Sequence, residues 1–170
     1  MPTGEPRIEH RDLRHYVGVS RRIAACQFAG TIGSGWPEVR AWMARRRIPS
    51  AGAPFIRYCV LGDEGTFELV LGVPVAQPVE RQIAGDGEVH AGVLPAGRYV
   101  VLRHVGPFEG LPHSHARLRQ WASERGVAFD RWHTGRGEAW RASAEHYLVD
   151  PCSEPDPSRW EVELTYLTAL

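Results

Sequence analysis

Glu163 is the residue of this chain whose type and position most suggest chemistry. The segment 160–167 (WEVELTYL) matches the earlier segment 67–74 (FELVLGVP), with an aromatic residue first and apolar residues in step. At the centre of the match, Glu163 stands where the first copy has Val70. A duplicated fold normally keeps such a position apolar, because a carboxylate away from water costs several kcal/mol unless it finds a partner. We therefore expect Glu163 to have a functional role.

The strand pattern around Glu163 predicts where its side chain points. Alternation with period two places Glu163 on the face opposite to that of Val162 and Leu164. The apolar set is expected to face the helices, which would turn Glu163 toward a groove. There it would attract a delocalised cation beside aromatic rings, or act as a general base. Two alternatives are a solvated carboxylate on an edge strand and an ion pair with an arginine such as Arg57 or Arg141.

Aromatic residues supply candidates for the walls of that groove. Tyr58 and Tyr147 occupy matching strand positions in the two halves of the chain, and either line the groove or fill the sheet. Trp36 and Phe55 are candidates for its rim.

The segment 131–141 is rich in glycine and charge and is expected to be irregular. Its Trp132 and Trp140 would either plug the edge of the core or cover the groove, and we favour the cover. By contrast, Trp42 and Trp121 have the spacing of helix faces packed on a sheet, so we expect both in the core.

Each half of the chain reads as strand, helix, strand, strand. The first half is predicted to contain a strand at 13–23, a helix at 36–47 and strands at 55–61 and 66–73. The second is predicted to contain a strand at 97–105, a helix at 112–125 and strands at 145–149 and 160–167. This order indicates an α+β fold of two pseudo-twofold-related halves, about 8–80 and 88–170, in a single domain spanning 1–170. The helices would cover one face of an antiparallel sheet, and the other faces would enclose a ligand groove between the halves.

Composition excludes several other functions. The 170 residues carry no formal net charge, which does not favour direct nucleic-acid binding. No apolar run approaches the roughly 20 residues that span a membrane, and no signal-peptide core begins the chain. The three cysteines and eight histidines lack metal-ligand spacing, so we expect no metal, no cofactor, no disulfide and a cytoplasmic location.

Several strings in the second half carry a family resemblance. They are 94–99 (LPAGRY), 104–108 (HVGPF), 145–151 (EHYLVDP) and 160–164 (WEVEL). In order and spacing they resemble the GyrI-like small-molecule-binding family, which also provides the effector-binding domain of some AraC-type and MerR-type regulators. The resemblance covers about residues 8–170. It implies a groove that binds drug-like, often aromatic and cationic ligands, and Glu163 falls on the position of the family's cavity glutamate.

Three functions remain open at this stage. The first is a stand-alone sensor or sequestering protein for bulky aromatic, often cationic compounds. The second is a hydrolase of electrophilic natural products of the cyclopropane type, as some family members resemble, with Glu163 as the base or water-positioning residue. The third is a modulator that binds DNA gyrase, because the family's name-giving member is associated with inhibition of that enzyme.

Overall fold

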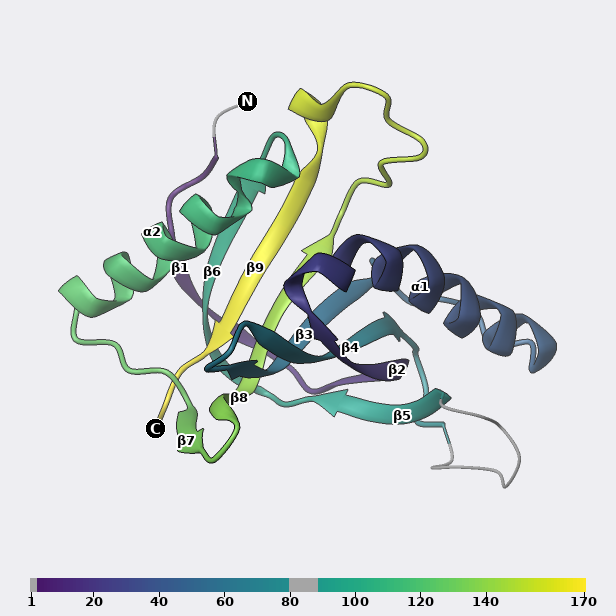
Figure 1. Cartoon of the computed structure of the whole chain (residues 1–170), viewed down its shortest axis with the longest axis horizontal. Coiled ribbons are helices and arrows are strands. Elements are labelled where there is room, and N and C mark those ends of the chain that lie inside the picture. The colour runs from purple at the N-terminus through teal and green to yellow at the C-terminus, as the bar shows by residue number, and fades with distance from the viewer. Residues whose placement is uncertain (1–2, 80–88) are drawn as a thin grey trace.

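The computed structural model describes residues 3–79 and 89–170 (Figure 1). The first half contains β1 (Arg7–Arg11), β2 (Arg14–Ala24), α1 (Phe28–Arg45), β3 (Phe55–Gly62) and β4 (Thr66–Pro74). The second contains β5 (Val89–Leu94), β6 (Gly97–Val105), α2 (Leu111–Glu124), β7 (Arg131–Thr134), β8 (Gly137–Tyr147) and β9 (Glu161–Leu167). Short 3₁₀ turns lie at Ala25–Gln27, Phe108–Gly110 and Pro157–Arg159. No helix in the described ranges is long and apolar enough to cross a membrane.

The nine strands found in the described residues form one antiparallel sheet in the order β1-β6-β9-β8-β3-β4-β2-β5, with β7 added on β8. This order is symmetric about its centre: β6, β9 and β8 of the second half occupy the positions that correspond to β2, β4 and β3 of the first half. The halves join where β3 pairs with β8, at register positions such as Ile56 with Glu145. The predicted α+β class, with two related halves and helices on one face of the sheet, is confirmed. The predicted ends of the half-repeats, at residues 80 and 88, lie outside the described residues.

Both helices pack on the same face of the sheet, which we call the helix face (Figure 1). Helix α1 begins at Phe28 rather than at the predicted Trp36, so the glycine-rich stretch before Trp36 is helical. Its inward side carries Phe28, Ile32, Gly35, Val39 and Trp42, at the spacing of a helix face. The bare Cα of Gly35 lets this face approach Leu71 of β4 closely.

The opposite side, which we call the back face, is covered by the sheet's own curl. Strand β1 pairs with β6 near one end of the sheet, whereas β2 pairs with β4 and β5 at the other. The chain passes from β1 to β2 through Asp12 and Leu13, so the sheet must curl until these ends come near each other. Two small clusters of buried residues lie beneath this crossing, one around Phe55 and one around Val101.

Candidate functional site

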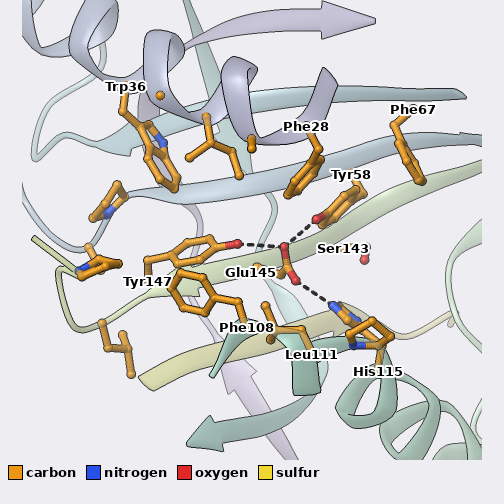
Figure 2. A pocket seen from close by; sticks show the side chains of 18 of the residues that line it. Phe28, Trp36, Tyr58, Phe67, Phe108, Leu111, His115, Ser143, Glu145 and Tyr147 are labelled. Atoms are coloured by element: carbon orange, nitrogen blue, oxygen red, sulfur yellow. Dashed lines mark hydrogen bonds and ion pairs between the residues drawn. The ribbon is translucent and has the colours of Figure 1, made fainter. Parts of the chain in front are cut away.

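A cavity of about 1380 Å³ opens on the helix face between the two halves. Helix α1 and strand β3 form one side of it, and α2, β8 and β9 form the other (Figure 2). Its lining is mostly apolar and aromatic, including Phe28, Ile32, Trp36, Phe67, Phe108 and Leu111. The volume exceeds the roughly 300–1,000 Å³ that small-molecule sites usually occupy, so the cavity has room for a bulky ligand.

The carboxylate of Glu145 lies at the floor of this cavity, with 4% of its side chain exposed. Its Oε1 accepts hydrogen bonds from the hydroxyls of Tyr58 at 2.5 Å and Tyr147 at 3.1 Å. Its Oε2 is 2.9 Å from Nε2 of His115 (Figure 2). Burial raises the pKa of both tyrosines, and the charge of Glu145 raises it further, so both phenols keep their protons and remain donors.

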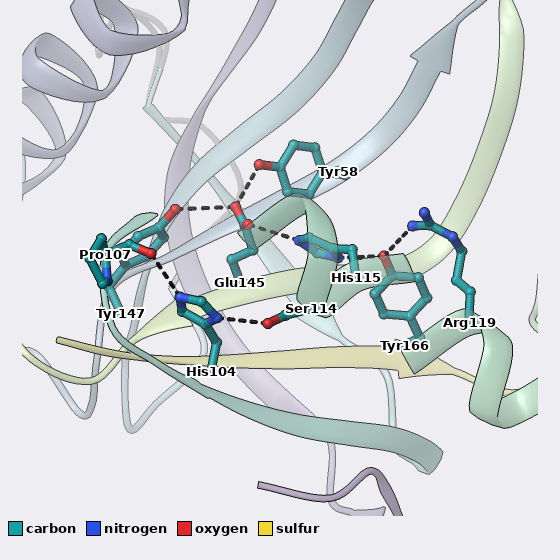
Figure 3. A network of polar contacts seen from close by, with 9 residues as sticks. All are labelled: Tyr58, His104, Pro107, Ser114, His115, Arg119, Glu145, Tyr147 and Tyr166. Carbon is teal, nitrogen blue, oxygen red and sulfur yellow. Dashed lines mark hydrogen bonds and ion pairs between the residues drawn. The ribbon is translucent and has the colours of Figure 1, made fainter. Parts of the chain in front are cut away.

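His115 continues the polar chain from Glu145 into helix α2 and strand β9. Its Nδ1 is 2.6 Å from the hydroxyl of Tyr166, which in turn accepts a hydrogen bond of 3.3 Å from Arg119 (Figure 3). The side chains are therefore hydrogen-bonded in the order Glu145, His115, Tyr166, Arg119. Hydrogen bonds therefore hold His115 at both ring nitrogens, with 15% of its side chain exposed.

A second histidine fixes the start of α2, on which His115 depends. His104 Nε2 is 2.9 Å from the carbonyl of Pro107, and its Nδ1 is 2.7 Å from the Ser114 hydroxyl (Figure 3). A carbonyl can only accept, so Nε2 donates to Pro107. These two hydrogen bonds tie α2 to β6 through His104, directly beside His115.

Aromatic rings enclose the mouth of the cavity. Tyr147 makes edge contacts with Trp36 and Phe108, at centroid distances of 5.2 Å and 5.5 Å. The ring of Phe108 also lies 4.6 Å, between centroids, from that of Trp160, the residue immediately before β9. Such rings present their negative faces to a ligand, so the walls suit flat or cationic molecules.

The structure brings three of the predicted aromatic residues to the cavity: Tyr58, Tyr147 and Trp36. Phe55 is not among them, because it is fully buried on the back face with its ring edge-on to Tyr16.

The two tryptophans predicted to cover the groove also lie elsewhere. The segment 131–141 is not irregular but forms the hairpin of β7 and the start of β8. Trp140 packs into the core against Phe129 and Tyr166. Trp132 is 44% exposed on β7, with the guanidinium of Arg141 4.9 Å above its ring.

Glu163 lies on the back face, so its predicted place at the centre of the groove needs correction. The alternation along β9 is as expected, with Val162 and Leu164 packed on the helix side. The cavity, however, opens on the helix face and not on the opposite face. Glu163 Oε1 pairs at 2.7 Å with Arg11, rather than with Arg57 or Arg141. Burial opposes ionisation of Glu163, but the hydrogen bond and charge of Arg11 outweigh it and lower the pKa of the carboxyl.

Two signals in the sequence would have identified the residues at the floor. Glu145 alternates with Ser143 and Tyr147, which places a carboxylate, a hydroxyl and a phenol on one face of a strand. His115 falls at helical spacing between Leu111 and Leu118, so it lies on the buried side of α2.

Solved structures of similar fold share this architecture at low identity. EcmrR, in an EcmrR–DNA complex, superposes with a TM-score of 0.76 at 15% identity, covering 96% of this chain and 57% of EcmrR. This chain thus spans a little over half of that protein. A hydrolase from Listeria innocua has a TM-score of 0.65 at 16% identity, covering 99% of this chain and 94% of its own.

A third structure is that of SAV2435 bound to tetraphenylphosphonium. It has a TM-score of 0.58 at 11% identity and covers 98% of this chain and 94% of its own. Among functionally curated proteins, none matches this sequence significantly. The family model for the GyrI-like small-molecule-binding domain matches residues 4–166, a range that includes every element lining the cavity. With that match across both halves, the chain belongs to the GyrI-like family of small-molecule-binding domains.

Proposed function

We propose that this protein binds bulky aromatic cations in the cavity on the helix face, with Glu145 as the charge that selects them. The observation that carries the proposal is the placement of Glu145, a buried carboxylate at the floor of a large, mostly apolar cavity with several aromatic rings. The role predicted for Glu163 passes to Glu145, because Glu145 has the position that the role requires.

Two hydroxyl donors converge on one oxygen of Glu145. A carboxylate only accepts hydrogen bonds, and the hydroxyls of Tyr58 and Tyr147 are aimed at its Oε1. The Glu145 side chain is almost fully buried, so solvent screens its charge weakly and its attraction for a cation is stronger than at the surface. Aromatic walls add cation–π attraction and apolar contact area.

The test compares a cationic probe with a neutral one of similar shape. Tetraphenylphosphonium and triphenylphosphine oxide would be titrated while the fluorescence of the tryptophans at the cavity is recorded. We expect tetraphenylphosphonium to bind at roughly micromolar concentration. Replacement Glu145→Gln keeps the side-chain shape and removes the charge. It should weaken binding of the cation by about 1–2 kcal/mol and leave binding of the neutral probe unchanged.

Glu163→Gln is the matched control, because it removes the same charge from the other face of the sheet. This variant should bind both probes as the unchanged protein does. If Glu145→Gln weakens the binding of both probes equally, or if Glu163→Gln weakens the binding of the cation instead, Glu145 is not the charge that selects cations.

A second function, hydrolysis, is favoured by the contact between Glu145 and His115. A carboxylate beside an imidazole could position and deprotonate a water molecule for attack on an electrophilic ligand. Mass spectrometry of the same incubations distinguishes the two functions. A ligand that gains the mass of one water, in a reaction lost with Glu145→Gln, identifies a hydrolase.

A further inference from the structure

We propose that His115 is the specificity-determining residue of the cavity, and that its proton decides whether the site accepts cations. The proposal rests on the proposed function, because it concerns the charge beside Glu145. Bound between Glu145 and Tyr166, the imidazole can be neutral or positively charged. The two states give the floor of the cavity different net charges.

The hydrogen-bond chain accommodates both states without moving heavy atoms. Arg119 can only donate to the Tyr166 hydroxyl, so that hydroxyl still has its own proton to direct. When His115 is neutral, Tyr166 donates to Nδ1 and Nε2–H donates to Glu145. When His115 is charged, Nδ1–H donates to the Tyr166 hydroxyl, whose own proton then turns away from the imidazole. A single hydroxyl rotation separates the two patterns.

The two states differ in what a ligand meets. With neutral His115, Glu145 presents one uncompensated negative charge to the cavity. With charged His115, an imidazolium lies 2.9 Å from that carboxylate and cancels the charge. Both side chains are mostly buried, so solvent screens this change little. A cation therefore binds the neutral-histidine state better, and its binding releases a proton from His115.

Other groups that face His115 or the cavity do not duplicate this role. The hydrogen-bonded network of Glu145 and His115 also contains the phenols of Tyr58, Tyr147 and Tyr166 and the permanently charged Arg119. Burial raises the pKa values of the three phenols. Farther out, the cavity lining includes Arg40, Glu109, Asp150 and Cys152. His115 is the histidine that lines the cavity among the described residues, whereas the neighbouring His104 is bound at both ring nitrogens, to Ser114 and Pro107, and does not line it. Histidine is the side chain whose charge ordinarily changes between about pH 5 and 8, so a dependence on pH in that range that is lost in His115→Gln points to His115.

The experiment measures binding of tetraphenylphosphonium, which has no titratable group, between pH 5 and 8. The dissociation constant should fall by about 5- to 30-fold in total as rising pH removes the proton from His115, because this proton cancels the same charge that Glu145→Gln removes, and it should level off above that range. Calorimetry in two buffers of different ionisation enthalpy should show up to about one proton released per cation bound. The neutral triphenylphosphine oxide should bind with little dependence on pH and no proton release.

Replacement His115→Gln provides the direct test, because its amide can still donate to Glu145 but cannot gain a proton. This variant should bind the cation across the whole range with the affinity that the unchanged protein reaches at high pH. His113→Gln, two positions away on the exposed side of α2, is the control and should keep the full pH dependence.

The outcomes separate this inference from the proposed function. If tetraphenylphosphonium does not bind at any pH, the proposed function fails. If it binds with the same affinity at pH 5 and pH 8 and releases no proton, the function stands and His115 has no such role. A pH dependence that survives His115→Gln overturns the inference as well. Should that variant not fold, proton release by the unchanged protein still decides, since its absence refutes the inference.

Discussion

Arg11 and Glu163 form an ion pair on the back face in which both side chains are largely removed from water, at 26% and 11% exposure. Glu163→Gln removes the shorter of the two ion pairs of Arg11 and leaves the one to Glu9 at 3.3 Å, and Arg11 Nε already lacks a hydrogen bond. We expect the variant to lose about 1–3 kcal/mol of unfolding free energy, measured by urea denaturation at pH 7.

Glu161→Gln is the control for this loss, since Glu161 lies on the same strand as Glu163. It pairs with Arg103 of β6, but both side chains are more exposed, at 35% for Glu161 and 49% for Arg103. Exposed pairs contribute little, so that change should be close to neutral. If the two variants lose the same unfolding free energy, the pair of Arg11 and Glu163 contributes no more to stability than the exposed pair of Arg103 and Glu161.

His146, also on the back face, makes stability depend on pH. Burial lowers the pKa of His146 to about 4, although the charge of Glu163 partly opposes the shift. In the unfolded chain a histidine titrates near pH 6.5, so unfolding takes up a proton between about pH 4 and 6.5. The stability from keeping His146 neutral is present in full above pH 6.5 and is lost as the pH falls toward 4. It amounts to about 3 kcal/mol.

His146→Gln, which keeps a polar group beside Thr165, should remove much of this dependence. Unfolding free energies at pH 7, 6, 5 and 4.5 would test it. His113→Gln, on the exposed side of α2, should leave the slope intact. A slope unchanged by His146→Gln would assign the acid sensitivity to other groups.

At the scale of elements, the approach of α1 to the sheet depends on Gly35. A Cβ added there would lie 2.1 Å from Cδ1 and 3.2 Å from Cγ of Leu71, a side chain that is fully buried. We therefore expect Gly35→Ala to destabilise the protein by about 1–3 kcal/mol and to displace α1 from the cavity wall, which weaker ligand binding would report.

Gly30 provides the matched comparison, because it lies in the same helix and a Cβ added there would meet nothing within 4 Å. Gly30→Ala should stabilise the protein by about 0.5–1 kcal/mol, since alanine loses less backbone entropy than glycine in a helix. If both changes stabilise, the contact between α1 and β4 is looser than the structure indicates.

For the whole molecule, local patterns predicted the elements but not the face on which the ligand site lies. Most strands follow from periodicity, and the predicted helix at 112–125 is found at Leu111–Glu124, whereas α1 starts at Phe28, well before the predicted residue 36. β1 was missed because Arg7–Arg11 carries no apolar alternation, only pairing with β6. The choice of Glu163 over Glu145 failed for a long-range reason. The alternation on each strand is readable, but the face that bears the cavity depends on how β3 and β8 join.

The junction between β3 and β8 has a consequence for the order of events in folding. The hairpin of β3 and β4 forms between neighbours in the chain, whereas β3 and β8 pair only after the second half has been made. Tyr58 comes from one side of this junction and Glu145 from the other, so the floor of the cavity does not exist until this long-range pairing is complete. A newly synthesised chain therefore cannot bind its ligand at this site before β3 and β8 have paired. A ligand present during synthesis can stabilise the finished fold but cannot direct the folding steps that come before this pairing.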